Sequence, residues 1–280
     1  MTITVQNDNE LDNLYTFLNL KEGDVVLYMG GRIDDDNLYP EKYRKYLNSK
    51  IKELNPDRII CHTHWYAKKY YNGNVLEKSK KIDMVLAYRA HFINGPTQTI
   101  SLEDYNDHGE YLKMITTINP NLVYVLYNFN KVNFTQSAVI LEDEKYENFS
   151  DGYDLKNIKS FYFDRSYRPN NLIDEARDEW DGLKFNCTDG FAIINRLISY
   201  DNIDLNIIGF SAFGQDEDSS RFTPYNLSDT DYKDLNYFDI KTSENQRIEA
   251  EILKNYIELK KINNLENYDM LTKFLHEVVY

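Results

Sequence analysis

The chain has 280 residues, with 46 acidic and 32 basic side chains and a formal net charge of −14. An acidic surface repels phosphate backbones and anionic lipids, so the composition argues against a nucleic acid or an anionic membrane as partner. Because 42% of the residues are hydrophobic, the chain can bury a sizeable core; a mainly disordered chain is excluded, and we expect a single domain over residues 1–280.

Short apolar runs rich in β-branched and aromatic residues predict strands that are buried on both faces. In chain order these runs are 25–29, 58–65, 84–92, 122–129, 160–163 and 205–210. Helical patterns alternate with them, at 39–54, 101–118, 188–199 and 243–262. Strands that alternate with helices indicate an α/β fold with a mostly parallel sheet flanked by helices.

Two polar and acidic segments, 130–157 and 214–241, are the least regular parts of the sequence. Long loops after strands in α/β enzymes are often functional, and 214–241 follows the predicted strand 205–210. We therefore expect 214–241 to act as a lid within the single domain, with a plain solvated loop as the alternative.

The first predicted strand ends in Gly30, Gly31 and Arg32. In a doubly wound sheet, ligands bind beyond the carboxyl ends of the strands, where paired glycines let the backbone approach a phosphate and an arginine neutralises it. The three carboxylates Asp34, Asp35 and Asp36 follow. They fit either a helix N-terminus or a site for a divalent cation.

The second predicted strand carries His62 and His64 near its end. Two residues apart on a strand, both imidazoles would lie on one face, as a metal-dependent hydrolase requires. Contact with a ligand and structural packing are the alternatives. The sequence has neither a G-x-S-x-G motif nor a cysteine beside an activating group, so it does not support a serine or cysteine nucleophile.

Several short motifs resemble those of the small bacterial sialyltransferases. The sequence NCTDGFA at 186–192, the strand LNIIGF at 205–210 and a later helix bearing Ser243 and Glu244 are similar to the C-terminal half of that family. The sequences VVLYMGG at 25–31 and CHTHWY at 61–66 stand where the family has an apolar strand with glycines and an asparagine-bearing stretch. The resemblance covers most of the chain in order, through short and degenerate motifs.

The resemblance implies a GT-A-like, Rossmann-type domain that binds CMP-sialic acid and transfers the sugar with inversion and without a metal cofactor. In this comparison Gly30 and Gly31 lie under the phosphate, and His62 or Thr63 contacts the nucleotide. The implied donor-binding residues are completed by Thr188, Asp189, Gly190 and, near the departing phosphate, Tyr237.

The sequence departs from that family at the general base. The family has a histidine three residues after the tyrosine, where this chain has Ile240. Asp239 is the nearest substitute, and His62 or His64 is the alternative base. Three functions stay open: a glycosyltransferase, a non-catalytic relative that binds a nucleotide or sugar, and a metal-dependent hydrolase built on His62, His64 and the Asp34–Asp36 carboxylates.

The expected partners are a CMP-linked sugar donor and a glycan acceptor. The N-terminal residues lack the basic and apolar regions of a secretory signal, and no stretch approaches the roughly 18 apolar residues of a membrane span. The two cysteines, Cys61 and Cys187, form no C-x-x-C pair. We therefore expect a soluble cytoplasmic protein.

Overall fold

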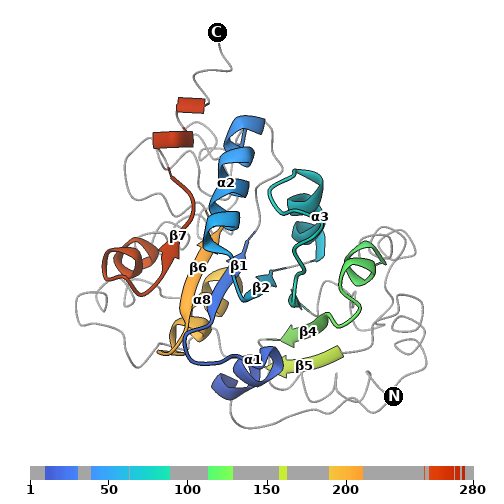
Figure 1. The fold of residues 1–280 in the computed structure, drawn as a ribbon. Helices are drawn as coiled ribbons and strands as arrows, with labels where there is room; N and C mark the ends of the chain where they lie inside the picture. Colours follow the sequence, from blue (N-terminus) through green and yellow to red (C-terminus); the bar gives the residue numbers. More distant parts are fainter. Residues whose placement is uncertain are drawn as a thin grey trace, which may run out of the picture.

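The structure is a computed structural model that describes residues 10–30, 39–62, 64–88, 113–128, 158–162, 189–210, 249, 252–267, 269–271 and 273–274. Within this part of the chain, a seven-stranded sheet forms the centre of the molecule (Figure 1). Every strand pair in it is parallel. The α/β class and the parallel sheet expected from the sequence are therefore confirmed.

The strands are β1 (Val25–Met29), β2 (Arg58–Cys61), β3 (Met84–Tyr88), β4 (Val123–Asn128), β5 (Ile158–Tyr162), β6 (Asp204–Ile208) and the two-residue β7 (Asn263–Asn264). The principal helices are α1 (Glu10–Leu18), α2 (Glu41–Leu54), α3 (His64–Asn72) and α8 (Asp189–Ile198). Residues 113–118 and 252–258 are also helical.

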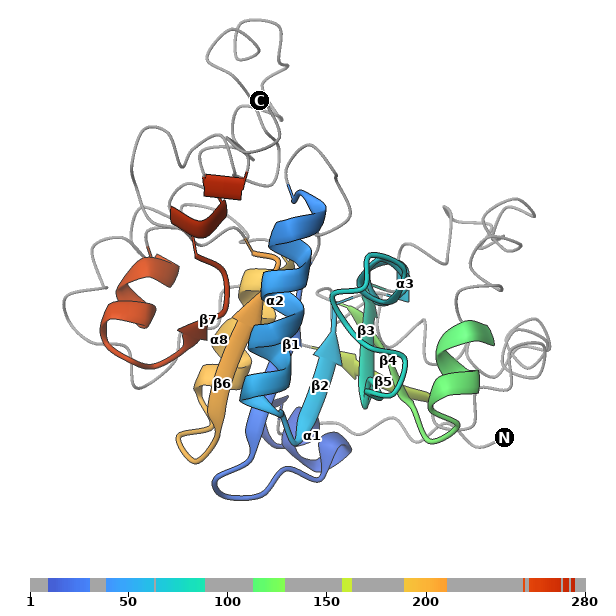
Figure 2. The same cartoon turned by 45° about the horizontal axis from the view of Figure 1, so that its top comes forward.

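Helices cover both faces of the sheet, as the uninterrupted apolar character of its strands predicts. Side chains alternate along β1: Leu27 and Met29 pack with residues of α2 and α3, whereas Val26 and Tyr28 pack with residues of α1 and α8. Figure 2 shows α2 in front of β1 and α8 behind the sheet. The fold is therefore doubly wound, with one core on each side.

The second predicted strand, 58–65, is too long. The strand β2 ends at Cys61, and α3 begins at His64. Because side chains alternate along β2, Ile60 packs in one core and Cys61 in the other. The strand thus contributes to both cores before it ends at Cys61. The turn after Cys61 therefore lies at the carboxyl end of the sheet.

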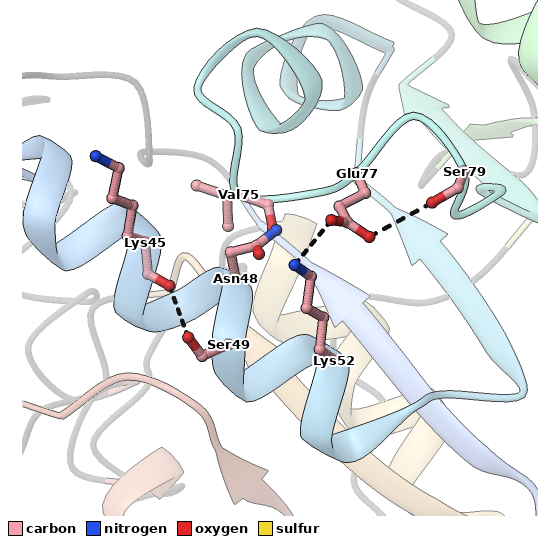
Figure 3. A network of polar contacts seen from close by, with 7 residues as sticks. All are labelled: Lys45, Asn48, Ser49, Lys52, Val75, Glu77 and Ser79. Atoms are coloured by element: carbon pink, nitrogen blue, oxygen red, sulfur yellow. Dashed lines mark hydrogen bonds and ion pairs between the residues drawn. The ribbon is translucent and has the colours of Figure 1, made fainter.

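Polar contacts join α2 to the segment that leads from α3 to β3 (Figure 3). The side-chain amide of Asn48 donates to the carbonyl oxygen of Val75 at 3.0 Å. The ammonium of Lys52 lies 2.8 Å from the carboxylate of Glu77, and both side chains are half exposed. The Asn48 bond is partly buried and therefore contributes more to this junction than the solvent-screened ion pair.

Candidate functional site

The order of the strands defines where a ligand is expected. Along the sheet the strands run β5-β4-β3-β2-β1-β6-β7. The strands β2 to β5 are therefore added on one side of β1, and the chain then returns to place β6 and β7 on the other side of β1. The reversal lies between β1 and β6, which is the topological switch point where doubly wound sheets bind ligands. Gly30 follows β1, and its amide donates to the carbonyl oxygen of Ile208 in β6 at 2.8 Å.

Two glycines meet around one aromatic ring at this edge, and a third lies beside them. A Cβ atom on Gly30 would lie 2.7 Å from Cζ of Phe210, and one on Gly190 would lie 2.8 Å from Cε1 of the same ring. Gly209 has φ +81°, and a Cβ there would lie 2.5 Å from Oη of Tyr70. In this structure the close approach of Phe210 thus accounts for the absence of a side chain at Gly30 and Gly190. The phosphate-binding role of Gly30 stays a prediction.

A tyrosine of β1 holds the histidine that follows β2. Oη of Tyr28 lies 2.7 Å from Nδ1 of His62. Tyr28 is fully buried, and its burial raises the pKa of the phenol well above its usual value; the nearby Cys61 and Asp189 raise it further. The phenol is therefore neutral at physiological pH. His62 itself is half buried.

Helix α3 places an aromatic ring beside His62 and a cation over that ring. The rings of His62 and Tyr66 are stacked, with centroids 6.1 Å apart and an interplanar angle of 22°. Nζ of Lys69 lies 5.8 Å from the centroid of Tyr66, within the range of a cation–π contact. In an acidic chain, this brings positive charge near the carboxyl end of β2.

The N-terminus of α8 lies at the same edge of the sheet. The helix begins at Asp189 and Gly190, and Gly190 contacts the ring of Phe210. The charge of Asp189 contributes to the raised pKa of Tyr28, so this carboxylate is close to the Tyr28–His62 pair. Backbone N–H groups at a helix N-terminus favour a negatively charged partner, which Asp189 supplies in part.

A buried glutamate fixes the turn after β6 from the other side. Oε2 of Glu266 accepts hydrogen bonds from the amides of Gly209 and Phe210, at 3.0 and 3.2 Å. Its Oε1 accepts a hydrogen bond from Tyr39 Oη at 2.6 Å. Glu266 follows β7, so these bonds tie the end of the sheet to the switch point and fix the backbone of Phe210.

The structure brings four of the predicted site residues to one place. Gly30 and Gly190 contact Phe210, whose ring centroid lies 5.0 Å from that of Tyr28. His62 is bonded to Tyr28, and Asp189 lies near that pair. Residues predicted from three separate segments thus surround the same two aromatic rings.

The other predicted residues lie outside the described part of the chain. They are Gly31, Arg32, Asp34, Asp35, Asp36, Thr63, Thr188, Tyr237 and Asp239, together with the segment 214–241. Among the described residues, no group of three or more His, Cys, Asp and Glu side chains is placed to hold a metal ion.

The expectation that His62 and His64 share one face of a strand is wrong. His62 follows the last residue of β2, and His64 is the first residue of α3, so period-two alternation does not apply to them. Nδ1 of His62 is also in hydrogen-bond contact with Tyr28. This removes the geometric argument for a histidine pair, on which the hydrolase interpretation depends.

The sequence did not mark Tyr28, Phe210 or Glu266 as site residues. Tyr28 and Phe210 lie inside apolar runs, where an aromatic residue usually packs in the core. Glu266 is a single acidic residue in a polar stretch, and its partners at Gly209 and Phe210 are more than 50 residues away in sequence. The hydroxyl of Tyr28, a polar group within an apolar strand, is the one feature of the sequence that could have indicated one of these site residues.

Comparisons with known proteins found no relative: no family model, no curated protein and no solved structure matches the chain. Within the part that the structure describes, no helix is long and apolar enough to cross a membrane.

Proposed function

We propose that the protein is a glycosyltransferase that binds a CMP-linked sugar at the β1/β6 switch point and transfers the sugar, with inversion, to a glycan acceptor. The observation that supports this best is the meeting of Gly30, His62, Asp189 and Gly190 around Tyr28 and Phe210. These residues belong to three of the segments that resemble the small bacterial sialyltransferases, and a GT-A-like site would draw on the same three.

The chemistry of the edge suits a donor with one phosphate. The backbone N–H groups at the start of α8, the imidazole of His62 and the ammonium of Lys69 offer donors and positive charge. A chain with a net charge of −14 binds an anion through such local groups, since its overall field is repulsive. CMP-sugars carry less negative charge than nucleoside-diphosphate sugars, so an acidic protein with a few local cationic groups binds them more readily.

Sugar transfer would require a base at the acceptor. The acceptor oxygen forms a bond to the anomeric carbon while the bond from that carbon to the phosphate oxygen breaks, and the electron pair leaves with CMP. The hydroxyl proton passes to a carboxylate, for which Asp239 is the candidate. Loss of a general base typically lowers the rate by about 10²–10⁴.

A nucleotide- or sugar-binding protein without catalytic activity is the second candidate. It is favoured by Ile240, which stands where the resembling enzymes have their histidine base.

Asp239→Ala distinguishes the two candidates. CMP binding is measured by calorimetry, and donor turnover is measured with CMP-sialic acid and a lactose acceptor. We expect Asp239→Ala to lower turnover by about 10²–10⁴ with CMP affinity within about twofold of the original protein. Glu22→Ala, which removes an exposed carboxylate at the amino end of β1, is the matched control and leaves both unchanged.

Two results would count against this proposal. CMP binding without turnover in the original protein would favour the second candidate. No binding of CMP or CMP-sialic acid at millimolar concentration would exclude the proposed glycosyltransferase and any role in binding CMP.

A further inference from the structure

We propose that Tyr28 is a positioning residue that holds His62 in the neutral tautomer with its proton on Nε2, so that His62 acts as a hydrogen-bond donor to the ligand and not as the base. The inference deepens the proposed function at the same site, and its ligand-binding part rests on that function. It starts from the contact of 2.7 Å between Tyr28 Oη and His62 Nδ1.

Burial determines which of the two groups donates. Tyr28 is 0% exposed, and in the described part of the structure Nδ1 of His62 is the hydrogen-bond partner of its hydroxyl. A hydroxyl that accepted from Nδ1–H would leave its own hydrogen without an acceptor among the described residues, and an unsatisfied buried donor is strongly disfavoured. Donation from Tyr28 Oη to Nδ1 satisfies both atoms.

The tautomer of His62 follows from this direction. A neutral imidazole has one N–H and one acceptor nitrogen, so Nδ1 as acceptor leaves the proton on Nε2. The ring of Tyr66 lies nearly parallel to the imidazole, with an interplanar angle of 22°. The hydrogen bond from Tyr28 therefore fixes which nitrogen carries the proton and how the ring is turned.

The position of His62 connects this tautomer to the ligand. His62 is half buried and follows β2 directly, and its amide donates to the carbonyl oxygen of Met29 at the end of β1. It therefore stands beside the switch point, whereas Tyr28 lies in the core beneath it. An Nε2–H group at this place is suited to an anionic oxygen, such as that of a nucleotide phosphate.

The same tautomer argues against two other roles. A base at Nε2 needs a lone pair there, and a metal ligand needs the same lone pair. With Nδ1 engaged by Tyr28, neither nitrogen of the neutral ring offers a lone pair for these roles. Among the candidate bases, this leaves the acceptor proton to Asp239.

The tautomer is tested on the protein without ligand. Two-bond ¹H–¹⁵N correlation spectra distinguish a neutral imidazole with Nε2–H from one with Nδ1–H. We expect the signals of His62 to show Nε2–H, and Tyr28→Phe to convert them to a mixture of tautomers. Tyr70→Phe is the matched control, because it removes another buried hydroxyl at this edge, one that bonds to the carbonyl of Ile208, and leaves the His62 signals unchanged.

Binding of CMP tests the donor role. His62→Ala is expected to weaken CMP binding about tenfold to a hundredfold, as for the loss of a hydrogen bond to a charged group. His62→Gln places an amide N–H near the position of Nε2 and cannot act as a base, so we expect it to retain affinity and turnover within a few fold. Tyr28→Phe is expected to weaken CMP binding by less than His62→Ala does.

Distinct results would overturn the inference. An Nδ1–H or doubly protonated His62 at pH 7.5 in the original protein contradicts the tautomer, whether or not CMP binds. Turnover lost equally in His62→Gln and His62→Ala, with CMP affinity retained, would identify His62 as the base. If the original protein does not bind CMP, the proposed function fails, while the spectra still decide the assignment of Tyr28.

Discussion

Glu266 shows how one buried residue can fix the backbone of a site. Its carboxylate accepts hydrogen bonds from two amides, those of Gly209 and Phe210, and from the hydroxyl of Tyr39. It is 6% exposed, so water replaces little of this contact when the carboxylate is removed. The negative charge lies close enough to Tyr43 to contribute, after burial, to the raised pKa of that phenol.

Replacement of Glu266 therefore destabilises the protein. We expect Glu266→Ala to lower the free energy of unfolding by about 3–5 kcal/mol, because two amides are left without an acceptor in the interior. Glu266→Gln keeps one oxygen, and Tyr39 can accept from the new amide, so its cost is about 1–2 kcal/mol. Urea unfolding measures the stability of both variants. Glu77→Ala, which removes one side of an exposed ion pair, is the control. A Glu266→Ala protein whose stability is within about 0.5 kcal/mol of the original would refute the structural role of Glu266.

Asp83 makes stability depend on pH in a direction that differs from most carboxylates. Its Oδ2 accepts from the amide of Ile59 at 2.8 Å, but burial dominates and raises the pKa of Asp83 above its usual value. The folded protein thus holds the Asp83 proton more tightly than the unfolded chain does. Its contribution to stability is complete below the ordinary pKa, near 3.8, and decreases as the pH rises through the raised value.

Asp83→Asn isolates this effect. The side-chain oxygen of the substituted asparagine can still accept from the amide of Ile59, and an asparagine does not titrate. We expect the difference in unfolding free energy, original protein minus variant, to fall as the pH rises from below 3.8 through the raised pKa of Asp83 and then to stay constant. Urea unfolding from pH 3 to 8 provides the comparison. A difference that grows with pH would mean that the hydrogen bond from Ile59 outweighs burial.

At the scale of elements, the amphipathic and apolar patterns predicted the central strands well. The predicted strand 25–29 coincides with β1, and 205–210 contains all but the first residue of β6. Burial on both faces makes these strands apolar throughout, which is a strong local signal. The helices 39–54 and 188–199 likewise correspond to α2 and α8 within two residues at either end.

Elements with weaker local signals were not predicted. Helix α1 was missed, although Leu14 and Leu18 have helical spacing and are buried, and the start of α3 was predicted as strand. The strand β7 has two residues, so no pattern can identify it. The pairing of β7 with β6 depends on the rest of the sheet, and a two-residue sequence does not indicate such a pairing.

The junction between α2 and the segment after α3 provides a test at this scale. We expect Asn48→Ala to lower the free energy of unfolding by about 1 kcal/mol, because the partly buried carbonyl of Val75 loses its donor. Ser49→Ala is the adjacent control: its hydroxyl bonds to Lys45 within the same exposed helix surface, and alanine is a better helix former. A cost for Asn48→Ala no greater than the cost for Ser49→Ala would contradict a stabilising role for the hydrogen bond from Asn48 to Val75.

For the whole molecule, the strand order determines which distant segments form the site. Tyr28 and His62 are 34 residues apart, and Glu266 is 57 residues from Gly209. The sequence located Gly30, His62, Asp189 and Gly190 individually, as residues beside predicted strands or at a predicted helix start. It could not show that Tyr28, Phe210 and Glu266 join them, because such contacts depend on the register of parallel strands and on the position of the reversal.

A crystal structure with CMP is the direct test of whether the β1/β6 switch point binds a CMP-type nucleotide. We predict electron density for CMP at the carboxyl ends of β1 and β6, with its phosphate within hydrogen-bond distance of Nε2 of His62 and near the start of α8. CMP bound at another edge of the sheet, or absent at saturating concentration, would show that the switch point is not a CMP site.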